Sequence, residues 1–183
     1  MPELRLQKLM KIAFVRSTIA VFILTLFVLQ SAQSAAAGEA VPLFELNSVY
    51  GKPVALESLR GKVVMINFWA TWCTPCVTEL PTMAALKESF SDRPFEILAI
   101  NMSEGADQIR RFLSNNNIDL NFPLLLDPAG IIAEEYEVKA LPATLIINRH
   151  GNFEFGGVGG RDWNEPAVRA ELLPLFEAIQ ASN

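Results

Sequence analysis

Two cysteines three positions apart are the side chains of this chain whose type and spacing best suit chemistry. Cys73 and Cys76 are the only cysteines among the 183 residues, and they lie in the string W-C-T-P-C. A thiol pair at this spacing can close into a disulfide and reopen, and its thiolate can attack a disulfide of another molecule. Two cysteines are too few for a disulfide-stapled scaffold, and with the single His150 they leave a four-ligand structural zinc site incomplete. The spacing therefore predicts one redox couple that uses no metal and no cofactor.

The two cysteines are expected to lie between a strand and a helix. Residues 63–69 form a nearly continuous run of β-branched and aromatic side chains, which is typical of a central strand covered on both faces. From residue 75 to residue 90 the apolar side chains recur every three or four positions, which predicts a helix with a kink at Pro81. Because the first turn of a helix stabilises a thiolate, we expect Cys73 to be the exposed nucleophile and Cys76 the shielded resolving thiol.

The other patterns predict a mixed sheet flanked by helices. A second strand at 95–100 completes a β-α-β unit, which predicts a parallel pair with a right-handed crossover. Only a short turn separates the strands expected at 144–147 and 153–158, so those two should be antiparallel. The remaining expected elements are a hairpin at 44–46 and 54–56, helices at 106–113 and 127–136, and a closing helix that begins near Asn164 and bends at Pro174. The glycine-rich stretch 156–160 fits no phosphate-binding loop and is interpreted as a flexible turn.

The first 37 residues have the features of a targeting segment. Four basic residues precede an apolar run at 19–29, and small residues follow it. This order describes a secretory signal peptide, and a retained N-terminal membrane anchor is the alternative because the alanines lengthen the apolar run. Either interpretation places residues 38–183 in the periplasm or another extracytoplasmic space, soluble after cleavage or anchored to the inner membrane. A buried N-terminal helix fits less well, since the segment has four positive charges and no polar face.

The composition excludes two classes of protein. With 51% hydrophobic and 19% charged residues, the chain is not expected to be intrinsically disordered. Its net charge is −5, and residues 38–183 alone carry −8 because the first 37 residues hold four basic residues and one acidic residue. A broad basic surface for nucleic-acid phosphates is therefore not expected.

Residues 64–81, VMINFWATWCTPCVTELP, resemble the active-site segment of the thioredoxin superfamily. This string is more similar to that of the extracytoplasmic TlpA/ResA-type thiol:disulfide oxidoreductases than to that of cytosolic thioredoxins. The resemblance extends from Pro42 to the C-terminus. It implies a thioredoxin-like three-layer α/β sandwich over residues 38–183, in which a mixed sheet is flanked by helices, with an N-terminal β-hairpin and a central insertion.

The resemblance also implies roles for single residues. Leu141-Pro142 matches the cis-proline that the superfamily packs against the active-site disulfide, and the backbone at Leu141 would then help to hold a substrate chain. Glu79 matches an acid that TlpA/ResA-type proteins place near the resolving cysteine, where a carboxylate could take the Cys76 proton. The alternative for Glu79 is a solvated acid near the helix start. Asn67 stands where thioredoxins carry a buried acid, and this departure strengthens the case for Glu79.

Three residues are expected to form the substrate-binding surface around the nucleophile. These are Trp72, Thr74 and Leu141. Trp69 is interpreted as a packing residue and His150 as a residue of a hairpin turn.

The sequence thus predicts an exported protein-disulfide reductase. Its partners would be proteins with cysteine pairs and a membrane thiol–disulfide protein that donates electrons, and the resemblance points to cytochrome c maturation or copper-site assembly. Two alternatives stay open. One is a thiol peroxidase of the peroxiredoxin-like branch, and the other is a non-enzymatic module that binds Cu(I) through Cys73 and Cys76.

Overall fold

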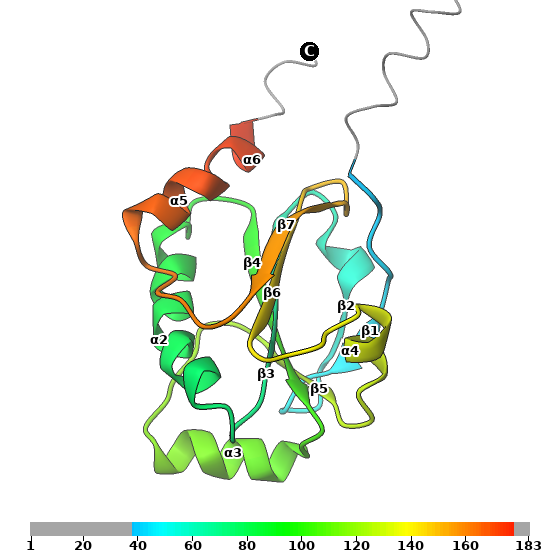
Figure 1. The fold of residues 1–183 in the computed structure, drawn as a ribbon, viewed down its shortest axis with the longest axis vertical. Coiled ribbons are helices and arrows are strands. Elements are labelled where there is room, and N and C mark those ends of the chain that lie inside the picture. The colour runs from blue at the N-terminus through cyan, green and yellow to red at the C-terminus, as the bar shows by residue number, and fades with distance from the viewer. Residues whose placement is uncertain (1–37, 178–183) are drawn as a thin grey trace, which may run out of the picture. The chain divides into compact units, whose positions relative to one another are not determined.

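A five-stranded mixed sheet forms the centre of the computed structural model, which describes residues 38–177 (Figure 1). The strand order is β5-β4-β3-β6-β7; β3 pairs in parallel with β4, and β6 pairs antiparallel with both β3 and β7. The predicted parallel and antiparallel pairs are therefore confirmed. The strands are β3 (Val63–Trp69), β4 (Phe95–Met102), β5 (Leu124–Asp127), β6 (Ala143–Ile147) and β7 (Phe153–Val158).

Helices cover one face of the sheet, and a hairpin with a short helix covers the other (Figure 1). The first layer contains α2 (Thr74–Ser89), α3 (Ala106–Asn115), α5 (Pro166–Leu172) and α6 (Pro174–Glu177). The second contains the hairpin of β1 (Glu45–Asn47) and β2 (Pro53–Ala55), the 3-10 helix η1 (Leu56–Leu59) and α4 (Ile131–Glu135). This arrangement confirms the predicted three-layer sandwich with its N-terminal hairpin. The predicted signal peptide or anchor lies outside the described residues.

Alternation along β3 explains why its sequence is apolar at every position except Asn67. Met65 and Trp69 pack into the core on the α2 side, whereas Ile66 and Phe68 pack into the core on the α4 side. All seven residues of β3 are buried. A strand covered on both faces needs apolar side chains at odd and even positions alike, and the sheet thereby fixes the position of the chain just before Cys73.

The segment around Asp127 differs from the sequence-based expectation. The strand β5 was not expected, because its apolar run is only three residues long and follows a proline. It pairs in parallel with β4 and ends at Asp127. The helix expected over 127–136 is accordingly reduced to α4, and the Asp127 carboxylate accepts a hydrogen bond from the N–H of Ala133 at 2.9 Å.

Two expectations near the C-terminus are also corrected. The closing helix is divided at Pro174 into α5 and α6 instead of bending there, since proline supplies no N–H for a helical hydrogen bond. Gly156 and Gly157 belong to β7 and pair with Leu145 and Thr144, so the first part of the glycine-rich stretch is a strand. A Cβ at Gly156 would lie 2.5 Å from the carbonyl oxygen of Thr144, which explains the absence of a side chain there.

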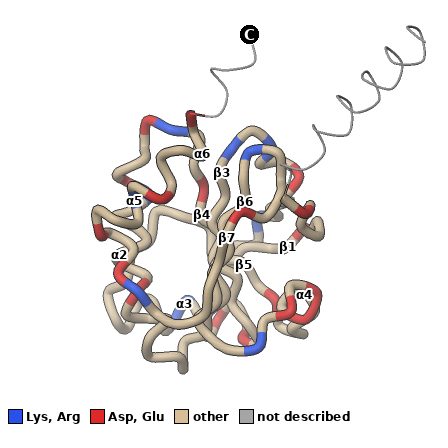
Figure 2. Tube along the Cα trace, turned by 45° about the horizontal axis from the view of Figure 1, so that its top comes forward, with Lys and Arg blue, Asp and Glu red and all other residues tan. Residues whose placement is uncertain are grey.

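Charged residues of both signs are distributed over this domain (Figure 2). Acidic residues gather around α4, whose sequence and flanks contain Glu134, Glu135 and Glu137. Within residues 38–177, no helix is both long enough and apolar enough to cross a membrane.

Candidate active site

The two cysteines form a disulfide. They lie where β3 leads into α2, a junction that Figure 1 shows. Cys73 is the N-cap residue of α2, and its Sγ accepts a hydrogen bond from the N–H of Cys76 at 3.3 Å. Cys73 is 7% exposed, whereas Cys76 is completely buried. Of the two sulfurs, Cys73 is thus the more accessible to an external thiol or disulfide, although it is less exposed than the sequence predicted.

An open groove beside Cys73 brings the three predicted substrate-binding residues together. Trp72 and Thr74, which flank Cys73 in the sequence, line this groove together with Leu141 from the segment before β6. The Trp72 side chain is 69% exposed, which is unusual for so large an apolar group. The lining residues are Trp72, Cys73, Thr74, Pro75, Met102, Ser103, Val138, Lys139, Ala140 and Leu141.

The peptide bond between Leu141 and Pro142 is cis, as the resemblance implied. Pro142 is buried and directly precedes β6. Its carbonyl oxygen accepts a hydrogen bond from the N–H of Gly159 at 2.9 Å, so the end of β7 fixes the backbone next to the groove.

Glu79 is buried behind the disulfide, one helical turn beyond Cys76. Its side chain is only 2% exposed, which contradicts the alternative of a solvated acid. The Nδ2 of Asn67 donates to Oε1 at 2.8 Å, and the Nε1 of Trp163 donates to Oε2 at 3.1 Å. The N–H of Arg161 also donates to Oε2, at 3.3 Å. The carboxyl group is thus held by donors from β3 and from the segment between β7 and α5.

Burial raises the pKa of Glu79 above its ordinary value, because a carboxylate loses its hydration there. The hydrogen bonds from Asn67, Trp163 and the Arg161 N–H lower this pKa in part, as does the positive charge of Arg161. A carboxyl group whose pKa lies closer to neutrality is well suited to exchange a proton with a thiol.

A second hollow connects the region of Glu79 to the protein surface. It shares Thr74 and Pro75 with the groove, but its other walls differ. Gly160 packs tightly against α2 here, since a Cβ on Gly160 would lie 3.1 Å from the Cβ of Pro75. The lining residues are Thr74, Pro75, Thr78, Glu79, Thr82, Gly160, Arg161 and Asp162.

A second buried carboxylate, which the sequence analysis missed, holds the loop before Cys73. Glu104 is 4% exposed and accepts hydrogen bonds from four donors. The N–H and hydroxyl of Thr71 are two of them, with the N–H at 2.7 Å, and the side chains of Asn101 and Gln108 are the others. An acid just before a helix resembles an ordinary solvated residue in a single sequence, so its position offered no signal.

The remaining predicted residues lie where the sequence analysis expected them. Trp69 is completely buried in the core on the α2 side, and among the described residues its Nε1 has no hydrogen-bond partner. His150 is exposed in the turn before β7, where its N–H donates to the Oδ1 of Asn148 at 2.9 Å. Residues 38–177 contain no group of three His, Cys, Asp or Glu side chains arranged to hold a metal ion.

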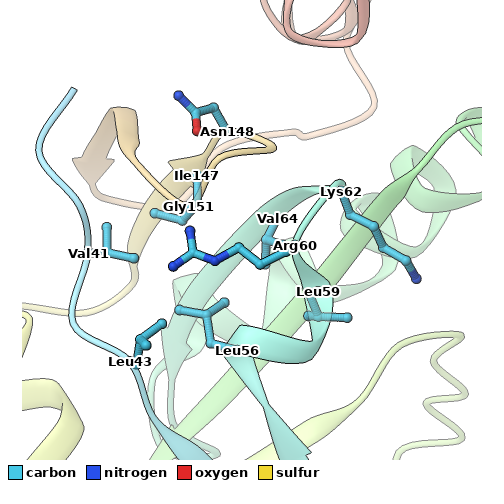
Figure 3. Close-up of a pocket in the computed structure, with 10 residues that line it drawn as sticks. All are labelled: Val41, Leu43, Leu56, Leu59, Arg60, Lys62, Val64, Ile147, Asn148 and Gly151. Atoms are coloured by element: carbon cyan, nitrogen blue, oxygen red, sulfur yellow. The ribbon is translucent and has the colours of Figure 1, made fainter. Parts of the chain in front are cut away.

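A separate hollow between η1 and the turn after β6 contains no cysteine (Figure 3). Arg60 extends across it toward Gly151, and the apolar side chains of Val41, Leu43 and Leu56 lie beside it. The cavity is about 10 Å³, roughly the space needed for one water molecule. The thiol chemistry therefore belongs to the groove at Cys73.

Comparison with known proteins agrees with this site. The sequence pattern of the AhpC/TSA family matches residues 37–155. The chain belongs to the AhpC/TSA family. It is similar to the thiol-disulfide oxidoreductase ResA of Bacillus subtilis (strain 168), with 37% identity over 119 residues that cover 65% of each chain.

Two further relatives extend the comparison. The ResA protein of Halalkalibacterium halodurans is 35% identical over 126 residues, which cover 69% of this chain and 70% of that protein. The structure of the exposed lipoprotein thioredoxin Etrx1 from Streptococcus pneumoniae strain TIGR4 has a TM-score of 0.62 and 27% identity, over 74% of this chain and 99% of that one. These homologues confirm the predicted enzyme class, a thiol–disulfide oxidoreductase with a C-x-x-C pair on a thioredoxin-like fold.

Proposed function

We propose that this protein reduces disulfides of exported proteins through Cys73 and Cys76. The observation that carries the proposal is the disulfide at the start of α2, of which only Cys73 reaches the groove. In the reduced protein, the Cys73 thiolate attacks a substrate disulfide, which breaks the substrate S–S bond and forms a mixed disulfide. Cys76 then attacks the Cys73 sulfur, and the substrate leaves with two electrons as a dithiol.

Glu79 acts as the base in the second half of this cycle. Cys76 is buried and must lose its proton before it attacks, and Glu79 is the buried carboxyl group one turn away on the same helix. Its raised pKa supports this role, because such a carboxyl group accepts a thiol proton more readily. The proton can later pass to solvent through the hollow at Thr78 and Asp162.

The groove supplies the binding surface for the substrate chain. Trp72 offers an exposed apolar surface beside the nucleophile, and Thr74 and the Leu141 backbone offer polar groups across the same opening. An extended chain with a cysteine could therefore lie between Trp72 and Leu141, with its sulfur at Cys73.

The cellular setting follows from the sequence features and the relatives. The basic and apolar N-terminal segment supports export from the cytoplasm, as a soluble periplasmic protein or an anchored one. The name of the pneumococcal neighbour describes an exposed lipoprotein, which is consistent with that location. A membrane thiol–disulfide protein would return electrons to the Cys73–Cys76 disulfide. Cysteine pairs of apocytochromes c or of copper sites are the proposed substrates.

Trapping the mixed disulfide tests this proposal. Cys76→Ser should accumulate partner proteins joined to Cys73 in the native compartment, because the resolving thiol is absent. The double variant Cys73→Ser/Cys76→Ser is the control and should trap none. Failure of Cys76→Ser to trap any protein would contradict exchange chemistry, and peroxide turnover that survives in Cys76→Ser would favour the peroxidase instead.

The direction of electron flow is tested by the reduction potential. A reductase should have a potential close to that of thioredoxin, about −270 mV. A value near −120 mV, typical of a strong oxidant, would overturn the proposed direction. Tight copper binding without reductase activity would instead favour the alternative in which Cys73 and Cys76 bind Cu(I).

A further inference from the structure

Trp163 reaches the Glu79 carboxyl group from a distant part of the chain. It lies between β7 and α5, 84 residues beyond Glu79, and its side chain is 5% exposed. The indole N–H donates to Oε2 of Glu79 at 3.1 Å. The donor and the acceptor are both shielded from water, so this hydrogen bond to a charged group should be strong.

Two more contacts hold the indole ring in place. The backbone N–H of Trp163 donates to the hydroxyl of Thr82 on α2 at 3.0 Å. The Arg161 guanidinium lies over the ring, 4.9 Å from its centroid, and the same group lies 3.8 Å from a carboxylate oxygen of Glu171 on α5. The ring is therefore fixed from α2 on one side and from its own segment on the other.

The groups around Glu79 divide into those that can titrate and those that cannot. The charged or titratable groups that face it are Arg161 and Asp162 from the segment after β7, and Cys76 on α2 in the reduced protein. Glu171 reaches the site only through its ion pair with Arg161. The neutral donors are the side chains of Asn67 and Trp163, so the indole can orient the carboxyl group without adding a charge.

We propose that Trp163 is a positioning residue for proton transfer at Cys76, and that its indole N–H orients the Glu79 carboxyl group and favours the ionised form that accepts the thiol proton. This inference rests on the proposed role of Glu79 as the base. Trp163 does not touch the cysteines in this role. It acts only through Glu79, and its loss should therefore change the pH dependence of the second exchange step and spare the first.

A pair of tryptophan variants tests this inference. Trp163→Phe keeps an aromatic ring under Arg161 but removes the donor to Glu79. The matched control, Trp69→Phe, removes the N–H of another buried indole, one that has no acceptor among the described residues. In the oxidised proteins, carbon-13 NMR of the Glu79 carboxyl group should show a pKa about one unit higher in Trp163→Phe. Trp69→Phe should leave this pKa unchanged.

The kinetic readout separates the two exchange steps. Reduced protein reacts with 5,5′-dithiobis(2-nitrobenzoate) in stopped flow, where the first thiolate released reports attack by Cys73 and the second reports attack by Cys76. In Trp163→Phe, the acidic limb of the pH–rate profile of the second step should move to higher pH, by the same interval as the Glu79 pKa. The pH–rate profile of the first step should stay unchanged. An equal loss of rate at every pH, with no displacement of the limb, would mean that Trp163 is only structural and would overturn the inference.

A measurement on the unaltered protein covers the case in which Trp163→Phe does not fold. The nitrogen-15 indole resonance of Trp163 should titrate with the same pKa as Glu79, and independence of the two would overturn the inference. Glu79→Gln separates the inference from the proposed function. If Glu79→Gln leaves the second step unchanged, the proposed base is wrong. If Glu79→Gln slows that step but Trp163→Phe moves neither the pKa nor the limb, only the role of Trp163 is wrong.

Discussion

At the scale of single residues, Glu79 is an acid whose ionised form is destabilised by burial in the folded protein. Burial raises the pKa of Glu79, so the folded protein binds a proton at this carboxyl group more tightly than the unfolded chain does. The resulting stabilisation is complete below the pKa of the unfolded chain and is lost as the pH rises through the higher pKa of the folded protein.

Because folding raises the pKa of Glu79, the stability of the protein should depend on pH. As the pH rises above about 4.3, the ordinary pKa of a glutamate, the free energy of unfolding of the oxidised wild-type protein should fall relative to that of Glu79→Gln, which cannot titrate. Urea unfolding at a series of pH values measures the difference. The matched control is Glu88→Gln, which removes an exposed acid of the same helix. Parallel curves for the wild type and Glu79→Gln would contradict the burial argument.

Only some residues of the candidate site are recognisable from the sequence. The two cysteines are recognisable from their spacing, and Glu79 and Pro142 from the resemblance. The roles of Trp163 and Glu104 are not recognisable, because Glu79 lies 84 residues from Trp163 and Thr71 lies 33 residues from Glu104. A single sequence contains no periodic or local pattern that links such positions, so the donors around a buried carboxylate emerge only from the folded chain.

At the scale of the elements, the loop between β3 and α2 depends on a carboxylate supplied from the next β-α connection. Both oxygens of Glu104 accept from two donors each, and two of the four donors belong to Thr71. The connection after β4 thereby holds the residues that lead into Cys73.

The second prediction concerns this carboxylate. Glu104→Gln places an NH₂ group against donors whichever way the amide is turned, so it should lower the free energy of unfolding by about 2 kcal/mol. Chemical denaturation provides the measurement. Glu88→Gln, which changes an exposed side chain in the same way, should stay within about 0.5 kcal/mol of the wild type. Equal stabilities of the two variants would show that the loop does not depend on Glu104.

Element boundaries followed the sequence wherever a long pattern existed. The nearly continuous apolar run of β3 and the helical spacing of α2 were sufficient to place the junction that carries the cysteines. The strand β5 escaped notice because three leucines after a proline specify neither a strand nor a helix, and its assignment depends on pairing with β4. Proline at 174 divides the closing helix, whereas α2 continues through Pro81.

At the scale of the whole molecule, we expect the fold to be stable without its disulfide. The bond joins residues only three positions apart, and apolar cores lie on both faces of the sheet. Loop closure of this length contributes about 2 kcal/mol in the chain-entropy account, against a total of roughly 5–15 kcal/mol for a domain.

The small contribution of the disulfide, relative to the total stability of a domain, predicts that the protein folds without it. The double variant Cys73→Ser/Cys76→Ser should remain folded and unfold in one cooperative transition, with a free energy of unfolding within about 2 kcal/mol of that of the oxidised wild type. Thermal and urea unfolding followed by circular dichroism provide the test, with the oxidised wild type in the same buffer as reference. A variant without a cooperative transition would show that the bond is structural and not only redox-active.

The two hollows at Thr74 and Pro75 have a consequence for the lifetime of the covalent complex. A partner chain joined to Cys73 would occupy the groove between Trp72 and Leu141, while Glu79 communicates with water on the side of Thr78 and Asp162. The partner and the proton would therefore use neighbouring openings that share only Thr74 and Pro75. A partner that leaves the second opening free keeps the carboxyl group in exchange with the medium, so the acidity of the compartment would influence how long each complex persists.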